Sequence, residues 1–278
     1  MSHPDAHGGR PQRLSAREIM KWKRRGERIP VLTAYDFPTA RILDRAGIPI
    51  ILVGDSLGNV VLGYESTLPV TVEEMIHHAR AVVRGRRRAL VVVDMPFLSF
   101  QVSPEKTVEA AGRIIKETGA DAVKIEGAGS RLQGIGRVVA AGIPVMGHLG
   151  LTPQSILDFG GYRVQAKGQA GRRRLVDDAR RLEEAGCFSL VLEAVPRAAA
   201  REVTDTVAIP TIGIGAGAAC DGQVLVLHDM CGLYDEFQPR FVRRFAELAR
   251  GLETAVTEYM QAVRDGSFPA DDESYMEE

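Results

Sequence analysis

The chain has 278 residues, of which 45% are hydrophobic, and a formal net charge of -1 at pH 7. This balance gives no electrostatic reason to expect nucleic acid or a membrane surface as a partner. The three cysteines, Cys187, Cys220 and Cys231, form no CxxC pair, which favours a reducing compartment over a disulfide scaffold. No apolar run approaches the roughly 20 residues that cross a bilayer, and the N-terminus lacks the apolar core of a secretory signal. We therefore expect a cytoplasmic protein with a large buried core.

Eight short apolar runs recur along the chain, and each is a candidate strand. They cover residues 31–35, 50–54, 89–94, 122–126, 143–148, 189–193, 209–215 and 223–229. Apolar residues follow one another in these runs instead of alternating with polar ones. This pattern is typical of parallel strands that are covered on both faces.

Helical segments lie between most of the runs, and their first turns carry capping residues. The predicted N-caps are Ser15, Thr71 and Ser103, the first two with a glutamate three residues further on, at the spacing of a capping box. A later segment places its apolar side chains on one helix face: Leu175, Val176, Ala179 and Leu182. A last, long helix is predicted over residues 239–266, with an apolar stripe from Phe241 to Val263.

The alternation of strands and helices favours a (β/α)8 barrel, and a doubly wound sheet is the alternative. No linker divides the chain, so we expect one barrel domain over residues 14–268. Residues 1–13 are expected to form a disordered polar tail, and residues 269–278 an acidic tail.

Polar side chains end most of the predicted strands, where barrel enzymes carry their chemistry. In chain order they are Tyr35 with Asp36, Asp55 with Ser56, Asp94, Lys124 with Glu126, His148, Glu193, and His228 with Asp229. For any single acid at a strand end, the structural alternative is that it caps the next helix. Several carboxylates around one axis require a cation, and oxygen ligands favour Mg²⁺ over Ca²⁺ or Zn²⁺.

Two of these residues raise a specific question. Glu193 follows the apolar run of residues 190–192, and an ionised carboxylate is costly to bury unless it is paired. Either the strand ends at the surface there or Glu193 has a chemical role. Lys124 shares a strand face with Glu126, so it either pairs with the carboxylates or binds an anionic substrate. The glycine run GIGAG, residues 213–217, lacks the acidic partner of a dinucleotide fingerprint and indicates a tight turn.

Longer segments resemble one known family. In chain order they are AYDFPTA, LVGDSLGNVVLGYESTLPVT, DMPF, VKIEGA, GHLGLTPQS, FGGYRVQ, LVLEAVP, IGIGAG and DGQVLVLHD. Together they resemble the ketopantoate hydroxymethyltransferase family, also called 3-methyl-2-oxobutanoate hydroxymethyltransferase, over residues 14–268. Departures are small: Ala128 stands where the family often has a second glycine, and VQAKG replaces a basic glycine-rich loop.

The resemblance implies a (β/α)8 TIM barrel of the phosphoenolpyruvate mutase and isocitrate lyase type, assembled as a homodecamer of two pentameric rings. It implies that a hydroxymethyl group passes from 5,10-methylenetetrahydrofolate to 3-methyl-2-oxobutanoate. The product is then 2-dehydropantoate, on the route to pantothenate and coenzyme A.

Individual residues match the family's functional positions. The resemblance implies Mg²⁺ ligands at Asp55, Asp94 and Glu126, and 2-oxo acid contacts at Asp55, Ser56, Asp94 and Lys124. It implies the proton acceptor at Glu193. Candidate folate contacts lie in GHLGLTPQS, which contains His148, and in FGGY.

Two other functions remain open. A Mg²⁺-dependent carbon–carbon lyase acting on a 2-oxo acid would use the same scaffold, but the chain lacks the KKCGH motif of such lyases. A non-catalytic barrel that serves as an assembly module is the third hypothesis. All of the acidic positions are present, which weighs against it.

Overall fold

The computed structural model describes residues 12–159, 164–235 and 239–275. The chain divides into two compact units, residues 1–226 and 227–278. The single-domain span of 14–268 and the two tails therefore stay predictions. Within the described ranges, no helix combines the length and the apolar character that crossing a bilayer requires.

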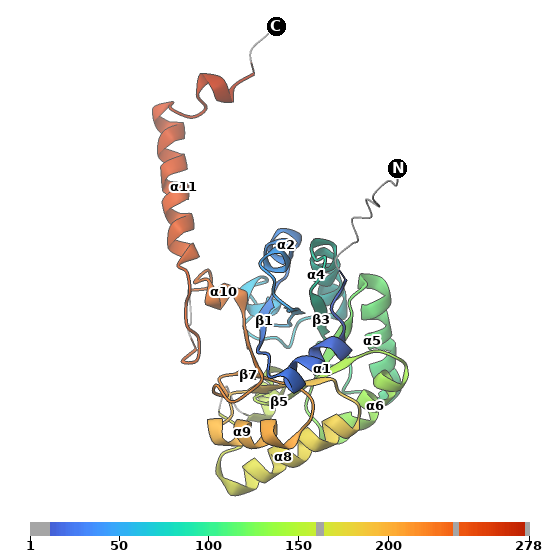
Figure 1. The fold of residues 1–278 in the computed structure, drawn as a ribbon. Helices are drawn as coiled ribbons and strands as arrows, with labels where there is room; N and C mark the ends of the chain where they lie inside the picture. The colour runs from blue at the N-terminus through green and yellow to red at the C-terminus, as the bar shows by residue number, and fades with distance from the viewer. Residues whose placement is uncertain (1–11, 160–163, 236–238, 276–278) are drawn as a thin grey trace, which may run out of the picture. The chain divides into compact units, whose positions relative to one another are not determined.

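The first unit is a closed barrel of eight parallel strands, joined in chain order from β1 to β8 and back to β1 (Figure 1). The strands are β1 (Ile29–Thr33), β2 (Ile50–Val53), β3 (Leu90–Asp94), β4 (Ala122–Glu126), β5 (Val145–Gly150), β6 (Ser189–Glu193), β7 (Thr211–Ile214) and β8 (Gly222–Leu225). This confirms the predicted barrel and excludes the doubly wound alternative.

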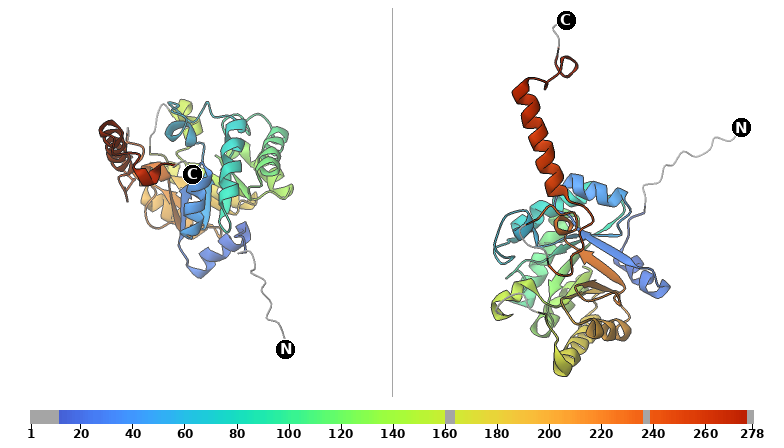
Figure 2. Two further views of the ribbon diagram at one scale, coloured as in Figure 1. Left: turned by 90° about the horizontal axis from the view of Figure 1, so that it is seen from above. Right: turned by 90° about the vertical axis from the view of Figure 1, so that its left-hand side faces the viewer.

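Helices surround the strands (Figure 2), and α2 packs against α4, α4 against α5, α5 against α6, and α8 against α9. The longer ones are α1 (Ala16–Arg25), α2 (Phe37–Arg45), α4 (Val72–Gly85), α5 (Pro104–Thr118), α6 (Leu132–Ala140), α8 (Gly168–Glu184) and α9 (Arg197–Thr206). Short turns of helix are α3 (Leu57–Val60), η1 (Gly129–Arg131), η2 (Pro153–Ser155) and α7 (Ile156–Phe159). Residues 215–221, all of them described, join β7 to β8 without a helix.

Three of the predicted helix starts show how local chemistry fixes these elements. Thr71 and Glu74 form the predicted capping box, and Ser103 caps α5 by accepting from the amide of Lys106. Ser15 caps α1, but the carboxylate of Glu18 pairs with Lys21 and Arg25 and does not reach back to the cap. The second capping box was therefore wrong, because two cations on the same helix compete for that carboxylate.

One apolar cluster fills the barrel where the strands begin. Its members are Leu14, Ala16, Ile19, Ile29, Val31, Ile50, Leu52, Leu90, Val92, Ala122, Met146, Phe188, Val191, Ile212 and Val224. Leu14, Ala16 and Ile19 come from α1 and the residues just before it. This helix therefore covers the end of the barrel where the strands begin, which we call the lower end. The predicted apolar face of α8 is also buried.

The second unit contains α10 (Leu227–Met230), α11 (Leu248–Asp265) and η3 (Asp271–Glu273). Strand β8 ends at Leu225, so His228 and Asp229 lie on a short helix and not at a strand end, which corrects that prediction. The last helix begins at Leu248 and not at residue 239. Its apolar stripe is exposed: Leu248, Leu252, Val256, Tyr259, Met260 and Val263.

Candidate active site

The upper end of the barrel, where the strands finish, collects charged side chains on the same faces that carry the apolar cluster below. Along β3, Leu90 and Val92 belong to that cluster, and Asp94 follows two residues later. Because side chains alternate along a strand, residues two apart share a face. The same step runs along β4 from Ala122 to Lys124 and Glu126, so the interior changes from apolar to ionic within one strand length.

Asp55 and Asp94 meet through the backbone at the ends of β2 and β3. The amide of Asp55 donates to Oδ2 of Asp94 over 3.1 Å, and both side chains are buried. A Cβ atom on Gly54 would lie 2.7 Å from Oγ of Ser56, so glycine leaves room for the Ser56 hydroxyl beside the acids. Ser56 in turn lies 2.9 Å from the hydroxyl of Tyr35.

A line of close contacts connects Asp94 to Glu193 through a buried lysine and a buried histidine. Nζ of Lys124 lies 3.2 Å from Oδ1 of Asp94 and 3.1 Å from Nδ1 of His148. The His148 ring lies 3.4 Å from Oε1 of Glu126 through Nδ1 and 3.2 Å from Oε2 of Glu193 through Nε2. The Glu193 side chain is 16% exposed, more than the other members of this line, so it faces the open side of the cluster. The strand therefore ends in a carboxylate that is partly exposed and paired with His148.

Burial and mutual repulsion shift the ionisation of these groups. Burial first, and then the charges of Asp94 and Glu126, raise the pKa of Asp55 well above its usual range. Burial also raises the pKa of Asp94, against the opposing effect of Lys124. Burial would lower the pKa of Lys124, but the carboxylates of Asp94, Glu126 and Asp55 outweigh it and raise that pKa.

His148 is shifted in the same direction as Lys124. Burial and the neighbouring Lys124 would lower the pKa of its ring, but the contacts with Glu126 and Glu193 prevail and raise it to about 8. The cluster thus holds four carboxylates against one lysine and one histidine. Such an excess of buried negative charge favours the binding of a cation.

The donor set fits a hard divalent ion. Oδ1 of Asp94 and Oε1 of Glu126 are buried and accept no hydrogen bond within the described chain. No group of three or more His, Cys, Asp or Glu side chains among the described residues already surrounds a metal position. Carboxylate oxygens suit Mg²⁺ better than Zn²⁺, because Mg²⁺ keeps waters and substrate oxygens beside one or two carboxylates.

The structure places Gln154 at this site, a residue that the sequence reasoning missed. It lies in η2, in the loop after β5, and its side chain is buried. Its amide nitrogen Nε2 donates to Oδ2 of Asp55 over 2.9 Å, and its backbone amide donates to Oε2 of Glu126 over 3.1 Å. The segment GHLGLTPQS was singled out for folate, and nothing in a neutral amide pointed to the acids.

Other predicted residues take structural roles or lie elsewhere. Asp36 caps α2 by accepting from the amide and the hydroxyl of Thr39. The GIGAG turn has positive φ at Gly215 and Gly217, as a tight turn requires. His148 belongs to the acidic cluster, and its contact with folate stays a prediction. In the FGGY segment, residues 160–162 lie outside the described residues.

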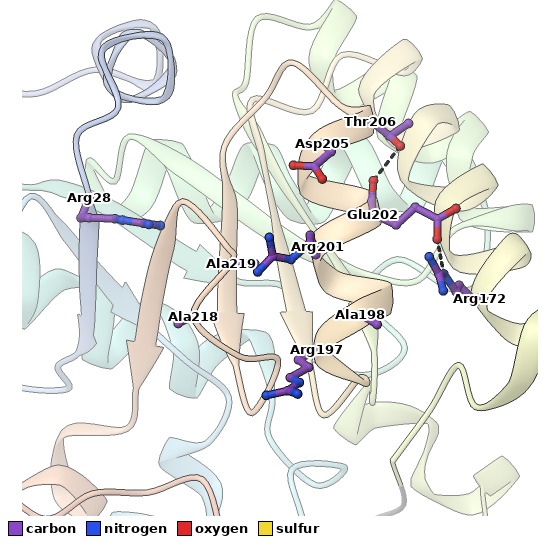
Figure 3. Close-up of a pocket in the computed structure, with 10 residues that line it drawn as sticks. All are labelled: Arg28, Arg172, Arg197, Ala198, Arg201, Glu202, Asp205, Thr206, Ala218 and Ala219. Carbon is purple, nitrogen blue, oxygen red and sulfur yellow. Dashed lines mark hydrogen bonds and ion pairs between the residues drawn. The ribbon is translucent and has the colours of Figure 1, made fainter.

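A separate pocket of about 940 Å³ lies on the outer side of the barrel, between α8, α9 and the turn before β8 (Figure 3). Arginines line it, among them Arg197 and Arg201 on successive turns of α9. Arg172 pairs with Glu202 at one of its sides. None of the residues at the mouth of the barrel lines this pocket, so it is distinct from the acidic site.

Comparison with known proteins identifies the family. The family model for ketopantoate hydroxymethyltransferase matches residues 13–271. The chain belongs to the ketopantoate hydroxymethyltransferase family. A 3-methyl-2-oxobutanoate hydroxymethyltransferase of Prosthecochloris aestuarii is 56% identical over 266 residues, covering 94% of this chain and 96% of the relative. One of Syntrophus aciditrophicus is 52% identical over 265 residues, covering 95% and 97%.

Solved structures of lower identity share the fold of this ketopantoate hydroxymethyltransferase family member. A 2,3-dimethylmalate lyase, a member of the PEP mutase/isocitrate lyase superfamily, aligns with a TM-score of 0.60 at 17% identity, covering 95% of this chain and 93% of the lyase. A phosphonopyruvate hydrolase crystallised with oxalate and Mg²⁺ aligns with a TM-score of 0.61 at 12% identity, covering 94% and 93%. The predicted barrel type is confirmed.

Proposed function

We propose that the protein transfers a hydroxymethyl group from 5,10-methylenetetrahydrofolate to 3-methyl-2-oxobutanoate and so forms 2-dehydropantoate. The observation that carries this proposal is the cluster of Asp55, Asp94, Glu126 and Lys124 beside Glu193, at the strand ends of a member of this family. The reaction needs a cation site, an anion-binding group and a base close together, and the cluster offers carboxylates, a lysine and a partly exposed glutamate suited to these three roles.

The acids and Lys124 account for substrate binding. Asp55, Asp94 and Glu126 would hold Mg²⁺, with Oδ1 of Asp94 and Oε1 of Glu126, which face Lys124 and His148, among the donors. Bound there, the ion would supply Lewis-acid stabilisation of the negative charge that develops on the 2-oxo acid. Lys124, whose ammonium is kept charged by the surrounding carboxylates, and Ser56 would hold the substrate carboxylate.

Glu193 is suited to remove the proton from C3 of the substrate. When the C3–H bond breaks, the proton goes to the carboxylate of Glu193 and the electron pair stays on the substrate as an enolate. Water cleaves the two C–N bonds of the methylene carbon, which leaves tetrahydrofolate and formaldehyde. The enolate carbon then bonds to the formaldehyde carbon, and the alkoxide that forms takes the proton back from Glu193 to become the hydroxyl group. His148, 3.2 Å from Oε2 of Glu193, holds the base toward the mouth of the barrel.

The cellular context completes the proposal. A cytoplasmic location suits an enzyme of pantothenate synthesis with three unpaired cysteines. A homodecamer of two pentameric rings is the assembly that the family resemblance implies. Sedimentation of the purified protein at several concentrations tests it, and a mass of one or two protomers would contradict it.

Product formation is the decisive measurement. Purified protein is incubated with 3-methyl-2-oxobutanoate, 5,10-methylenetetrahydrofolate and Mg²⁺, with and without a chelator, and 2-dehydropantoate is measured by mass spectrometry. We expect product only without chelator, and none when the folate is omitted. A folded protein that forms no product in any arm, or cleaves a 2-oxo acid without folate, would overturn the proposal.

A further inference from the structure

We infer that Gln154 is a positioning residue that holds Asp55 and Glu126 in the orientation in which they bind a divalent cation. The inference rests on the proposed function, because it assumes that these acids bind Mg²⁺. Gln154 touches neither a substrate atom nor a reacting atom in this role. It acts through the two carboxylates.

The contacts of Gln154 reach three of the strand ends that carry acids. Nε2 donates to Oδ2 of Asp55 after β2 and, over 2.9 Å, to the carbonyl oxygen of Met95 after β3. The backbone amide donates to Oε2 of Glu126 at the end of β4. One residue thus links segments that are far apart in the sequence.

In Glu126 and Asp94, one carboxylate oxygen is held by a hydrogen bond within the protein, and the other is left to contact a ligand. Oε2 of Glu126 accepts from Gln154, and Oδ2 of Asp94 accepts from the amide of Asp55. The other oxygens, Oε1 of Glu126 and Oδ1 of Asp94, accept no hydrogen bond in the described chain and face Nδ1 of His148 at 3.4 Å and Nζ of Lys124 at 3.2 Å. This arrangement is the one expected of metal ligands whose second oxygen is fixed by a neighbouring donor.

The loop after β5 explains how a neutral side chain comes to lie among the acids. Gly150 has φ of 95°, and a Cβ atom there would lie 2.2 Å from the carbonyl oxygen of Glu193, so the chain turns sharply at that point. The amide of Leu151 donates to the same carbonyl oxygen over 2.8 Å. Gln154 lies in the short helical turn that begins at Pro153, and the hydrogen bond from the hydroxyl of Thr152 to that of Ser155 spans this turn.

The network also fixes which way the Gln154 amide faces. Both neighbours of Nε2, Asp55 and the Met95 carbonyl, are acceptors, and the side-chain oxygen accepts from Nε2 of Gln101 over 3.1 Å. The reversed amide would place an oxygen against two acceptors, which is unfavourable. The donor is therefore committed to the carboxylate, as a fixed orientation of the metal ligand requires.

The test measures cation binding directly. Chelator-treated Gln154→Leu protein is titrated calorimetrically with Mg²⁺ and, separately, with Ca²⁺, in the presence of 3-methyl-2-oxobutanoate and without folate. Gln133→Leu, at an exposed glutamine on α6, is the matched control. We expect the Mg²⁺ affinity of Gln154→Leu to fall by about 10- to 100-fold, and that of the control to be unchanged.

The comparison of the two ions separates positioning from a loss of folded protein. A loosened site discriminates less against the larger and geometrically more tolerant Ca²⁺, so the ratio of Mg²⁺ to Ca²⁺ affinity should fall as well. An unchanged ratio with fewer binding sites would overturn the inference, as would unchanged Mg²⁺ affinity. If Gln154→Leu does not fold, Gln154→Asn, which keeps a polar amide on a side chain too short to reach Asp55, is judged by the same criteria.

The control arms distinguish this inference from the proposed function. Wild-type protein that binds Mg²⁺ and forms product, beside a Gln154 variant with wild-type affinity, overturns the inference alone. Wild-type protein that binds no Mg²⁺ overturns both.

Discussion

The two ends of the barrel interior use the same strands for opposite purposes. At the lower end, side chains such as Leu90 and Ala122 pack into one apolar cluster that α1 covers. At the upper end, Asp94 and Glu126 on the same strand faces form a buried ionic cluster. Apolar burial stabilises the fold, whereas each buried carboxylate beside others costs free energy until a cation or a proton arrives. Stability and chemistry are therefore separated along the barrel axis.

The largest effect is expected at the upper end, from Glu193→Gln. The amide keeps the size of the side chain but accepts no proton from C3, so kcat should fall by about 10²- to 10⁴-fold. The urea midpoint should change little, because the side chain is partly exposed. Steady-state kinetics and urea unfolding of the same preparation check both. Full turnover by the variant would remove Glu193 as the base.

The converse effect is expected at the lower end, from Ile50→Ala. Ile50 is fully buried in the apolar cluster, so its truncation should lower the free energy of unfolding by about 2–5 kcal/mol. Turnover per folded molecule should stay at the wild-type level. Ile50→Val, with one methyl group removed, is the matched control and should cost about 0.5–1.5 kcal/mol. A large drop in kcat of folded Ile50→Ala would show that the two ends are coupled.

Most of the fold could be predicted because its signals are local. The apolar run at residues 122–126 is observed as β4 with the same bounds. The eighth run was extended too far, to residue 229, because the apolar pattern alone cannot distinguish a strand from the short helix α10. Asp36 shows the same limit, since a cap and a catalytic acid both follow a strand.

The site was predictable only where its residues end strands. Asp55, Asp94, Glu126, Lys124 and Glu193 were expected together, and the structure brings them together. Their individual roles remain predictions. Gln154 was missed because its position depends on the return of the loop after β5 across the barrel, which no periodicity in the sequence encodes.

Asp55→Asn is expected to raise the free energy of unfolding in the absence of metal, an effect smaller than that of Ile50→Ala and opposite in sign. Burial and the charges of Asp94 and Glu126 raise the pKa of Asp55, so its ionised form is disfavoured in the folded state. A neutral amide removes that repulsion and should stabilise the chelator-treated protein by about 1 kcal/mol at pH 7. Urea unfolding with and without Mg²⁺ measures this. A variant that is destabilised in both conditions would contradict the claim that the upper end costs stability.

The smallest effect is expected where α1 begins, at Ser15→Ala. The Ser15 side chain accepts from the backbone amide of Glu18 over 3.3 Å, a long and exposed cap, so its loss should cost about 0.5–1 kcal/mol. Ser103→Ala on α5 is the matched control, since that cap has the same geometry at 3.2 Å but lies on a helix that contributes nothing to the lower cluster. Both variants should turn over normally. If Ser15→Ala alone also lowered kcat, fraying of α1 at the lower end would affect the acidic cluster at the upper end. The separation of stability and chemistry along the barrel axis would then be incomplete.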